Sequence, residues 1–182
     1  MDFSLKEYED DFQTSLTNRL SKILPKDWGN KNFIISSTEE EWKKIAKDIT
    51  NDLSKDRLLT QAWPEKYGGI GATNLKQAIF NHILSYMNAP INNMTGVNWI
   101  GPALMMYGNQ EQKELYLPRI AEAVDQWCLL YSEPTAGSDL ASLQTHAVKN
   151  GDNYVINGQK IWASNAEESD FGLVAVRTNP DA

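Results

Sequence analysis

The hydrophobic pattern of the chain changes once, near Trp127, and this change limits the folds that the sequence can adopt. Before Trp127, apolar residues recur at steps of three and four, which places them on one face of a helix. After it, short apolar runs alternate with turn sequences, as in hairpins. Helices followed by strands are typical of an α+β fold. We therefore predict an all-α domain over residues 1–124, followed by an incomplete antiparallel β-domain over residues 125–182.

Local signals give the approximate bounds of the expected helices. Ser4 and Glu7 have the spacing of a capping box, and Pro25 ends the helix that they begin. Thr38 precedes three glutamates, which the positive end of a helix dipole stabilises. Pro118 predicts a break in the last helix. The helices are expected at 5–23, 38–53, 74–88, 99–107 and 110–123.

The second part of the chain contains apolar runs separated by turns. The sequence Asn-Gly-Asp-Asn at 150–153 is a hairpin signal, and Asn157-Gly158 is a second turn. The strands are expected at 127–131, 144–149, 154–157, 159–163 and 173–177. Strands this short form only a marginal sheet, and residues 178–182 have the sequence of a turn before another strand. We therefore expect the β-domain to be incomplete and the 182 residues to be a fragment.

The charge balance argues against several classes of partner. The chain has 17 basic and 24 acidic residues and a net charge of −7, whereas nucleic acids and anionic membranes attract basic surfaces. No apolar run reaches the ~18 residues of a membrane span. One cysteine and two histidines disfavour a zinc site. The start of the chain is acidic, whereas a signal peptide is basic there. Together these observations favour a cytoplasmic protein that binds neither nucleic acid nor metal.

Several reactive residue types have ordinary structural explanations. Cys128 lies in an apolar run and is expected to be an inert core thiol. His82 is expected beside the helical core, and His146 on the surface of a strand. The glycine-rich segment 65–71 lacks the GK[ST] ending of a phosphate-binding loop, so a plain loop between helices is favoured.

The segment 132–139 follows the first expected strand and is rich in small and polar residues. Its hydroxyls at Ser132 and Ser138 can donate to a carbonyl or a phosphate, although an ordinary hairpin loop has a similar composition. No G-x-S-x-G motif surrounds either serine, which argues against a serine hydrolase. Trp162, at the end of an expected strand, either packs within the protein or forms a stacking wall for a planar ligand. The residue pattern leaves both alternatives open.

Two segments together resemble the acyl-CoA dehydrogenase family. Residues 127–140, WCLLYSEPTAGSDL, are similar to the family's strand followed by [ST]-E-P-x-x-G-S-D. Residues 154–165, YVINGQKIWASN, are similar to its hairpin N-G-x-K-x-W-I-[ST]-N. Shorter matches lie at 64–69, 108–118 and 175–178. The order and spacing also agree, so the resemblance covers nearly the whole chain.

The resemblance implies that FAD binds against both segments. The implied cofactor-binding residues are Leu129, Leu130, Tyr131, Ser132, Trp162, Ala163 and Ser164. The first three contribute backbone atoms and Ser132 its hydroxyl, while Trp162 lies against the isoalloxazine and Ser164 hydrogen-bonds near N5. Ser138 would lie beside the CoA portion of the substrate, with Asp139 shaping the turn. The chain departs from the family at Thr135, commonly glycine, and at Ala163, which replaces a larger apolar residue.

The implied reaction is the α,β-dehydrogenation of an acyl-CoA thioester, with electron-transfer flavoprotein as the electron acceptor. In the family, the carboxylate that removes the α-proton belongs to a later helical domain, so no residue here is assigned as the catalytic base. The family also forms homo-oligomers, whereas the 182 residues alone are expected to be inactive. Two alternatives stay open: a non-catalytic partner or regulatory module that keeps the fold, and a relative with other flavin chemistry, such as oxidation by oxygen.

Overall fold

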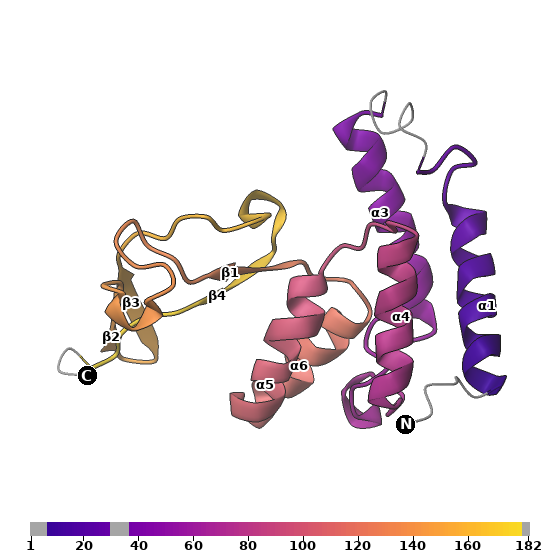
Figure 1. Cartoon of the computed structure of the whole chain (residues 1–182). Helices are drawn as coiled ribbons and strands as arrows, with labels where there is room; N and C mark the ends of the chain where they lie inside the picture. The colour runs from indigo at the N-terminus through magenta and orange to yellow at the C-terminus, as the bar shows by residue number, and fades with distance from the viewer. Residues whose placement is uncertain (1–6, 30–36, 180–182) are drawn as a thin grey trace.

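The computed structural model describes residues 7–29 and 37–179. Its helices gather on one side of the molecule and its strands extend to the other (Figure 1). The longer helices are α1 (Glu7–Ile23), α3 (Glu39–Lys55), α4 (Asn74–Tyr86), α5 (Gly101–Tyr107) and α6 (Gln110–Ala121). Short helical turns are η1 (Glu65–Tyr67), η2 (Gly96–Ile100), η3 (Leu140–Ser142) and η4 (Ala166–Glu168). The order confirms the expected α+β class.

The start of α3 follows from its capping residues. The Thr38 hydroxyl accepts a hydrogen bond from the Glu41 amide at 3.2 Å, and the Glu41 carboxylate accepts one from the Thr38 amide at 2.8 Å. This reciprocal pair satisfies two amides that the helix itself leaves free. The expected start at Thr38 is therefore confirmed. The capping box expected at Ser4 lies outside the described residues.

The break expected at Pro118 is wrong, because α6 continues to Ala121. Pro118 is exposed, and its carbonyl still accepts from the Glu122 amide at 2.9 Å. On the opposite side, Leu117 and Ile120 are completely buried. Packing of these two side chains stabilises the last turn enough to offset the hydrogen bond that proline removes.

The helices enclose one apolar core. Its most deeply buried apolar side chains are Leu20, Ile49, Leu53, Leu59, Phe80, Ile100, Leu117 and Ile120. His82 does not lie beside this core as expected: it is exposed on α4, where its ring stacks on Tyr86 at 6.3 Å between centroids. Cys128 is buried and His146 exposed, as expected.

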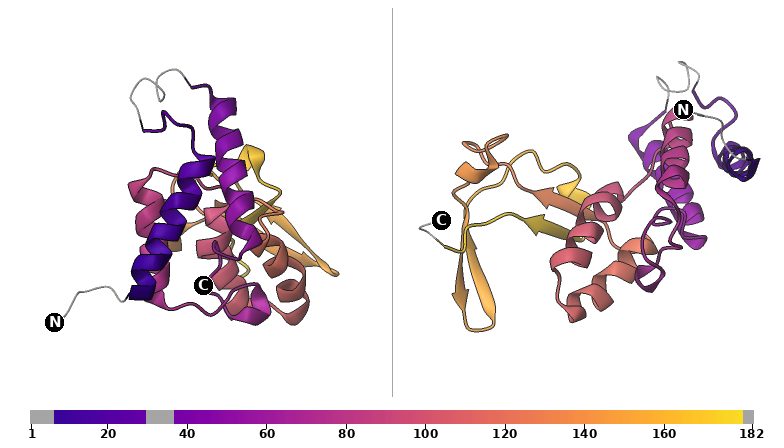
Figure 2. Two further views of the ribbon diagram at one scale, coloured as in Figure 1. Left: turned by 90° about the vertical axis from the view of Figure 1, so that its right-hand side faces the viewer. Right: turned by 60° about the horizontal axis from the view of Figure 1, so that its bottom comes forward.

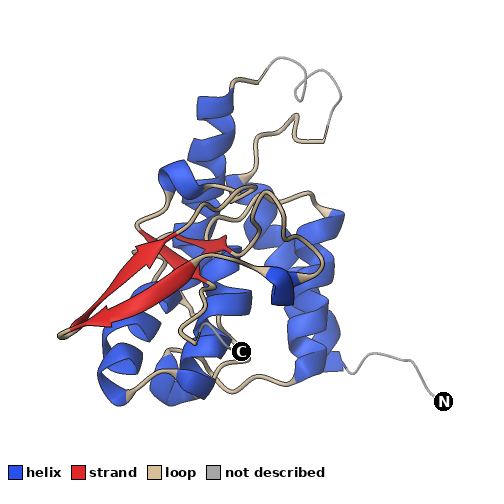
Figure 3. Ribbon diagram, turned by 90° about the vertical axis from the view of Figure 1, so that its left-hand side faces the viewer, coloured by secondary structure: helices blue, strands red, loops and turns tan. Residues whose placement is uncertain are grey.

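Within the described residues, four strands form two separate two-stranded sheets (Figure 3). They are β1 (Trp127–Leu130), β2 (His146–Asn150), β3 (Asn153–Asn157) and β4 (Phe171–Val174). The pair β2–β3 is the expected antiparallel hairpin, which turns at Gly151 with φ of 60° and projects away from the helices (Figure 2). Glycine adopts such a positive φ at little cost.

The expectation of antiparallel strands is wrong for β1 and β4, which pair in parallel with Leu129 opposite Leu173. Parallel neighbours need a long connection, and the segment containing β2 and β3 supplies it. The strand expected at 159–163 is also absent from the described structure, where these residues form irregular backbone. Within that segment, the Ile161 amide donates to the Ser132 carbonyl at 2.9 Å.

Candidate functional site

The loop after β1 lies directly against the segment that follows β3. The Ser132 carbonyl accepts from the Ile161 amide at 2.9 Å, and the Tyr131 carbonyl accepts from Lys160 Nζ at 2.9 Å. Ile161 immediately precedes Trp162 in the chain. The two segments singled out in the sequence therefore meet, with Ser132 and Trp162 at their junction.

Glu133 holds this junction together. Its carboxylate is 4% exposed and accepts from Lys160 Nζ at 2.8 Å, from the Gln144 amide at 2.6 Å and from the Thr145 amide at 2.9 Å. These partners come from the segment after β3 and from the residues before β2. One buried carboxylate thus connects three stretches of chain. Sequence reasoning assigned no role to Glu133 or Lys160, although both lie within the two motifs; a charged residue at a fixed place in each motif was the available signal.

The same contacts lower the pKa of Glu133 to about 2. The hydrogen bond from Lys160 is the largest cause, and the backbone amides of Gln144 and Thr145 add to it, whereas burial acts in the opposite direction. The ordinary pKa of such a carboxyl is 4.5. The folded state therefore binds a proton at Glu133 less readily than the unfolded chain does.

This difference predicts an acid-dependent loss of stability. Because the folded pKa is depressed, the stabilisation from Glu133 is present above pH 4.5 and is lost as the pH falls towards 2. We expect the melting temperature of the chain to drop across this window, and the Glu133→Gln variant to show a flatter curve there. Thermal unfolding followed by circular dichroism from pH 6 to 2 measures both. Parallel curves for the two proteins would contradict this assignment.

The tryptophan beside the junction is exposed rather than packed. Trp162 is 86% exposed, and its backbone has φ of 57°, a conformation that is rare for a bulky residue. Hydrogen bonds on either side fix this conformation, from Ile161 to Ser132 and from the Ala166 amide to the Ala163 carbonyl at 3.2 Å. Strained backbone of this kind clusters at functional sites. Trp162 is therefore not a core residue of the described chain, whereas packing at an interface and stacking on a planar ligand both stay open.

The other expected site residues lie in and around this junction. Leu129, Leu130, Tyr131, Ser132 and Ala163 are half-buried, whereas Ser138, Asp139 and Ser164 are exposed. The Asp139 carbonyl begins η3 by accepting from the Ser142 amide at 3.2 Å and from its hydroxyl at 2.8 Å. Ser138 precedes this turn, and no described contact joins it to Trp162.

These features fit the polar edge and the flat face of a flavin. The exposed indole of Trp162 offers a stacking surface, since aromatic rings pack well against planar ligands. The hydroxyls of Ser132 and Ser164 make no hydrogen bond within the described part of the chain, so both are available to a ligand. Among the described residues, no group of three or more side chains could hold a metal ion.

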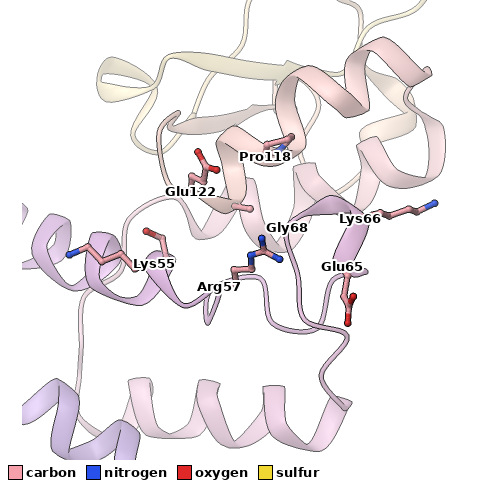
Figure 4. A pocket seen from close by; sticks show the side chains of 9 residues that line it. Lys55, Arg57, Glu65, Lys66, Gly68, Pro118 and Glu122 are labelled. Carbon is pink, nitrogen blue, oxygen red and sulfur yellow. The ribbon is translucent and has the colours of Figure 1, made fainter.

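A cavity of about 540 Å³ lies in the helical domain, outside this junction (Figure 4). It is lined by Ser54, Lys55, Arg57, Glu65, Lys66, Gly68, Pro118, Ala121 and Glu122. Glu65 and Lys66 belong to η1, and Gly68 lies in the turn after it. The glycine-rich segment 65–71 thus forms a connection between helices, as expected. None is among the expected site residues.

Within 7–29 and 37–179, no helix has the length and apolar character of a membrane span.

Comparison with known proteins identifies the family. Residues 32–123 match the acyl-CoA dehydrogenase N-terminal domain, and residues 128–182 match the acyl-CoA dehydrogenase middle domain. The chain belongs to the acyl-CoA dehydrogenase family.

Among curated relatives, acyl-CoA dehydrogenase FadE26 of Mycobacterium tuberculosis is 40% identical over 150 residues, which cover 81% of this chain and 37% of the relative. FadE29 of the same organism is 37% identical over 134 residues, or 74% of this chain and 34% of the relative. The chain therefore matches little more than a third of the length of these proteins.

Solved structures show the same fold. The ChsE4–ChsE5 complex from Mycobacterium tuberculosis is similar with a TM-score of 0.83 and 35% identity, over 100% of this chain and 45% of that one. The Tcur3481–Tcur3483 steroid ACAD is similar with a TM-score of 0.83 and 32% identity, over 100% of this chain and 46% of that one. An acyl-CoA dehydrogenase from Geobacillus kaustophilus is similar with a TM-score of 0.76 and 28% identity, over 100% of this chain and 46% of that one.

Proposed function

We propose that this chain carries the flavin-binding and thioester-binding part of an FAD-dependent acyl-CoA dehydrogenase. The observation that carries the proposal is the junction of the Ser132 loop with the segment that presents Trp162. Family membership supports it, because the relatives bear the name of this activity.

Each residue at the junction then has a defined task. The backbone of Leu129 to Tyr131 and the Ser132 hydroxyl bind the edge of the flavin, Trp162 and Ala163 cover its face, and Ser164 donates near N5. Bound FAD supplies the hydride acceptor for α,β-dehydrogenation. Hydrogen-bond donors placed at N5 and at the ring edge stabilise negative charge that develops there. Ser138 and Asp139 position the CoA portion of the substrate.

No carboxylate of this chain is proposed as the base that removes the α-proton. Glu133, the buried carboxylate nearest the junction, is bound to Lys160 and to two backbone amides, and its low pKa makes it a poor proton acceptor. We propose that the base lies outside these 182 residues and that they do not turn over substrate alone. In the complete cytoplasmic enzyme, electrons leave to electron-transfer flavoprotein, and the enzyme is a homo-oligomer.

A second candidate is a partner subunit that keeps the fold without the chemistry. Its support is that two of the similar structures are described as pairs of different proteins. The two candidates differ in flavin binding, because only the first requires the donors and the indole at the junction to contact FAD.

Replacing Trp162 by alanine tests the first candidate. We expect FAD affinity to fall by roughly 1–3 kcal/mol, or about 5- to 150-fold, if the indole stacks on the flavin. Equilibrium dialysis of FAD against concentrated protein measures the affinity. Trp99→Ala is the matched control, since Trp99 is also exposed, at 64%, but lies on η2 in the helical domain. Equal affinities for the two variants, or no FAD binding by the unaltered chain, would refute the proposal.

A further inference from the structure

A second, polar cavity lies where the helical domain meets the strands. It has a volume of about 200 Å³, and its polar lining includes Thr50, Asn51, Asn92, Asn93, Gln126 and Glu168. These residues come from α3, from the segment before η2, from the residue before β1 and from η4. The volume is enough for a small organic group or for several water molecules.

Asn93 is the side chain in this lining whose chemistry is unexplained. It is 8% exposed, and neither Oδ1 nor Nδ2 has a hydrogen-bond partner within the described residues. A buried amide without partners costs the full desolvation of its polar atoms, so native proteins rarely leave one. The donor and acceptor of Asn93 therefore need a polar partner from outside the described residues, which is either ordered water or a ligand in this cavity.

The backbone around Asn93 is shaped to hold this amide in place. Asn93 has φ of 59°, a conformation that asparagine tolerates better than most residues. Its side chain lies against Gly96, where an added Cβ would come within 2.3 Å of Asn93 Oδ1. Gly96 begins η2, a π-helical turn, and such turns are frequent at functional sites. Only a glycine at position 96 leaves the room that the amide occupies.

The surrounding groups favour an uncharged ligand. The Thr50 hydroxyl donates to the Ala46 carbonyl at 2.6 Å and accepts from the Asn92 amide at 2.8 Å. Asp170 accepts from the Gln126 amide at 2.8 Å, and Glu168 is paired with Lys43. The lining contains two carboxylates, of Glu168 and Asp170, and one ammonium group, of Lys47. Because Lys43 neutralises Glu168, the remaining Asp170 and Lys47 leave the lining without net charge, and the unpartnered amide of Asn93 suits a neutral donor or acceptor.

We infer that this cavity is a subsite for an uncharged hydrogen-bonding group, such as a hydroxyl, ketone or amide. The inference rests on the proposed function in naming the ligand: the group belongs to the acyl portion of the thioester. The turns between Ala163 and Glu168 support this connection, because the Ala166 amide donates to the Ala163 carbonyl and the Glu168 amide to the Asn165 carbonyl at 3.1 Å. They join the expected flavin wall at Ser164 to the lining of the cavity.

Two matched probes test the subsite without any flavin or CoA. Cyclopentanol and cyclopentane have the same ring and differ by one hydroxyl. We expect cyclopentanol, titrated into the 15N-labelled chain, to shift the Asn93 side-chain signal and the Thr50 and Gln126 amide signals in a saturable way. Cyclopentane should bind at least about fivefold more weakly. Equal binding of both probes, or no saturable shift because ordered water alone fills the site, would overturn the inference.

The Asn93→Gly variant identifies the group responsible. Glycine keeps the positive φ without strain, so the variant should fold, and its affinity for cyclopentanol should fall about fivefold. Asn88→Gly is the matched control, because Asn88 also has a positive φ, of 48°, but is exposed at the end of α4. An unchanged affinity in Asn93→Gly would refute the subsite. If Trp162→Ala and Trp99→Ala bind FAD equally well while cyclopentanol still binds as expected, the proposed function is refuted and the subsite is not.

Discussion

Replacing Glu133 by glutamine is expected to lower the melting temperature of the chain by roughly 10 °C. The amide keeps the shape of the side chain but removes the charge that Lys160 faces at 2.8 Å. Lys160 is only 9% exposed, so the variant leaves its ammonium group buried without a negative charge beside it, facing only neutral oxygens such as the Tyr131 carbonyl. Leaving one charge of a buried pair uncompensated is among the most destabilising single changes. Thermal unfolding by circular dichroism gives the shift.

The loss should be local as well as global. The Gln144 and Thr145 amides both donate to the Glu133 carboxylate, and an amide side chain can accept from only one atom. We expect faster hydrogen exchange at these two amides in Glu133→Gln. Faster exchange is also expected at the Ile161 amide, because it bonds the same loop.

Two further variants separate the charge pair from the packing. The double variant Glu133→Gln/Lys160→Met removes both charges, and it should recover part of the stability lost in Glu133→Gln. Glu65→Gln serves as a surface control, since Glu65 is exposed and has no described ion pair. A melting temperature of Glu133→Gln equal to that of Glu65→Gln would show that the buried pair does not hold the junction.

The helical half was predictable because its signals are local. Thr38 and Glu41 are three residues apart, and Ile49 and Leu53 are four apart, so cap and buried face can both be read from neighbouring residues. The strand pairing was not local. β1 and β4 are separated by the whole β2–β3 hairpin, and no signal in neighbouring residues indicates that they pair in parallel. Pro118 misled for the same reason, because tertiary packing overrode a local preference.

The site was predictable as a set of motifs but not as an arrangement. Only the family resemblance predicted that Ser132 and Trp162 lie close together, and the residue pattern could not show whether Trp162 is packed or exposed. Nor could it find Asn93. An asparagine in the run Pro-Ile-Asn-Asn-Met has the composition of a surface loop, and only the three-dimensional structure shows its amide buried without a partner. Burial and hydrogen-bond satisfaction depend on contacts between distant segments, which residue patterns do not encode.

Replacing Gly69 by alanine is expected to destabilise the helical domain by about 3 kcal/mol or more. A Cβ at this position would lie 1.9 Å from the Trp63 carbonyl oxygen and 2.4 Å from its carbon. Both are backbone atoms, so no side-chain rotation can relieve the overlap. The surrounding loop is also fixed, because the Gly69 amide donates to the Pro64 carbonyl at 3.2 Å and the Gly71 amide to the Trp63 carbonyl at 3.0 Å.

The control for this variant lies in the loop of the candidate site. Gly137 has no atom within 4 Å of an added Cβ and no positive φ, so Gly137→Ala should change stability by about 0.5 kcal/mol or less. Urea unfolding of the two variants gives the comparison. Equal stabilities would mean that the loop at 64–71 rearranges freely. A large difference would assign the paired glycines of the Pro-Glu-Lys-Tyr-Gly-Gly sequence to close backbone packing against Trp63, rather than to binding a phosphate.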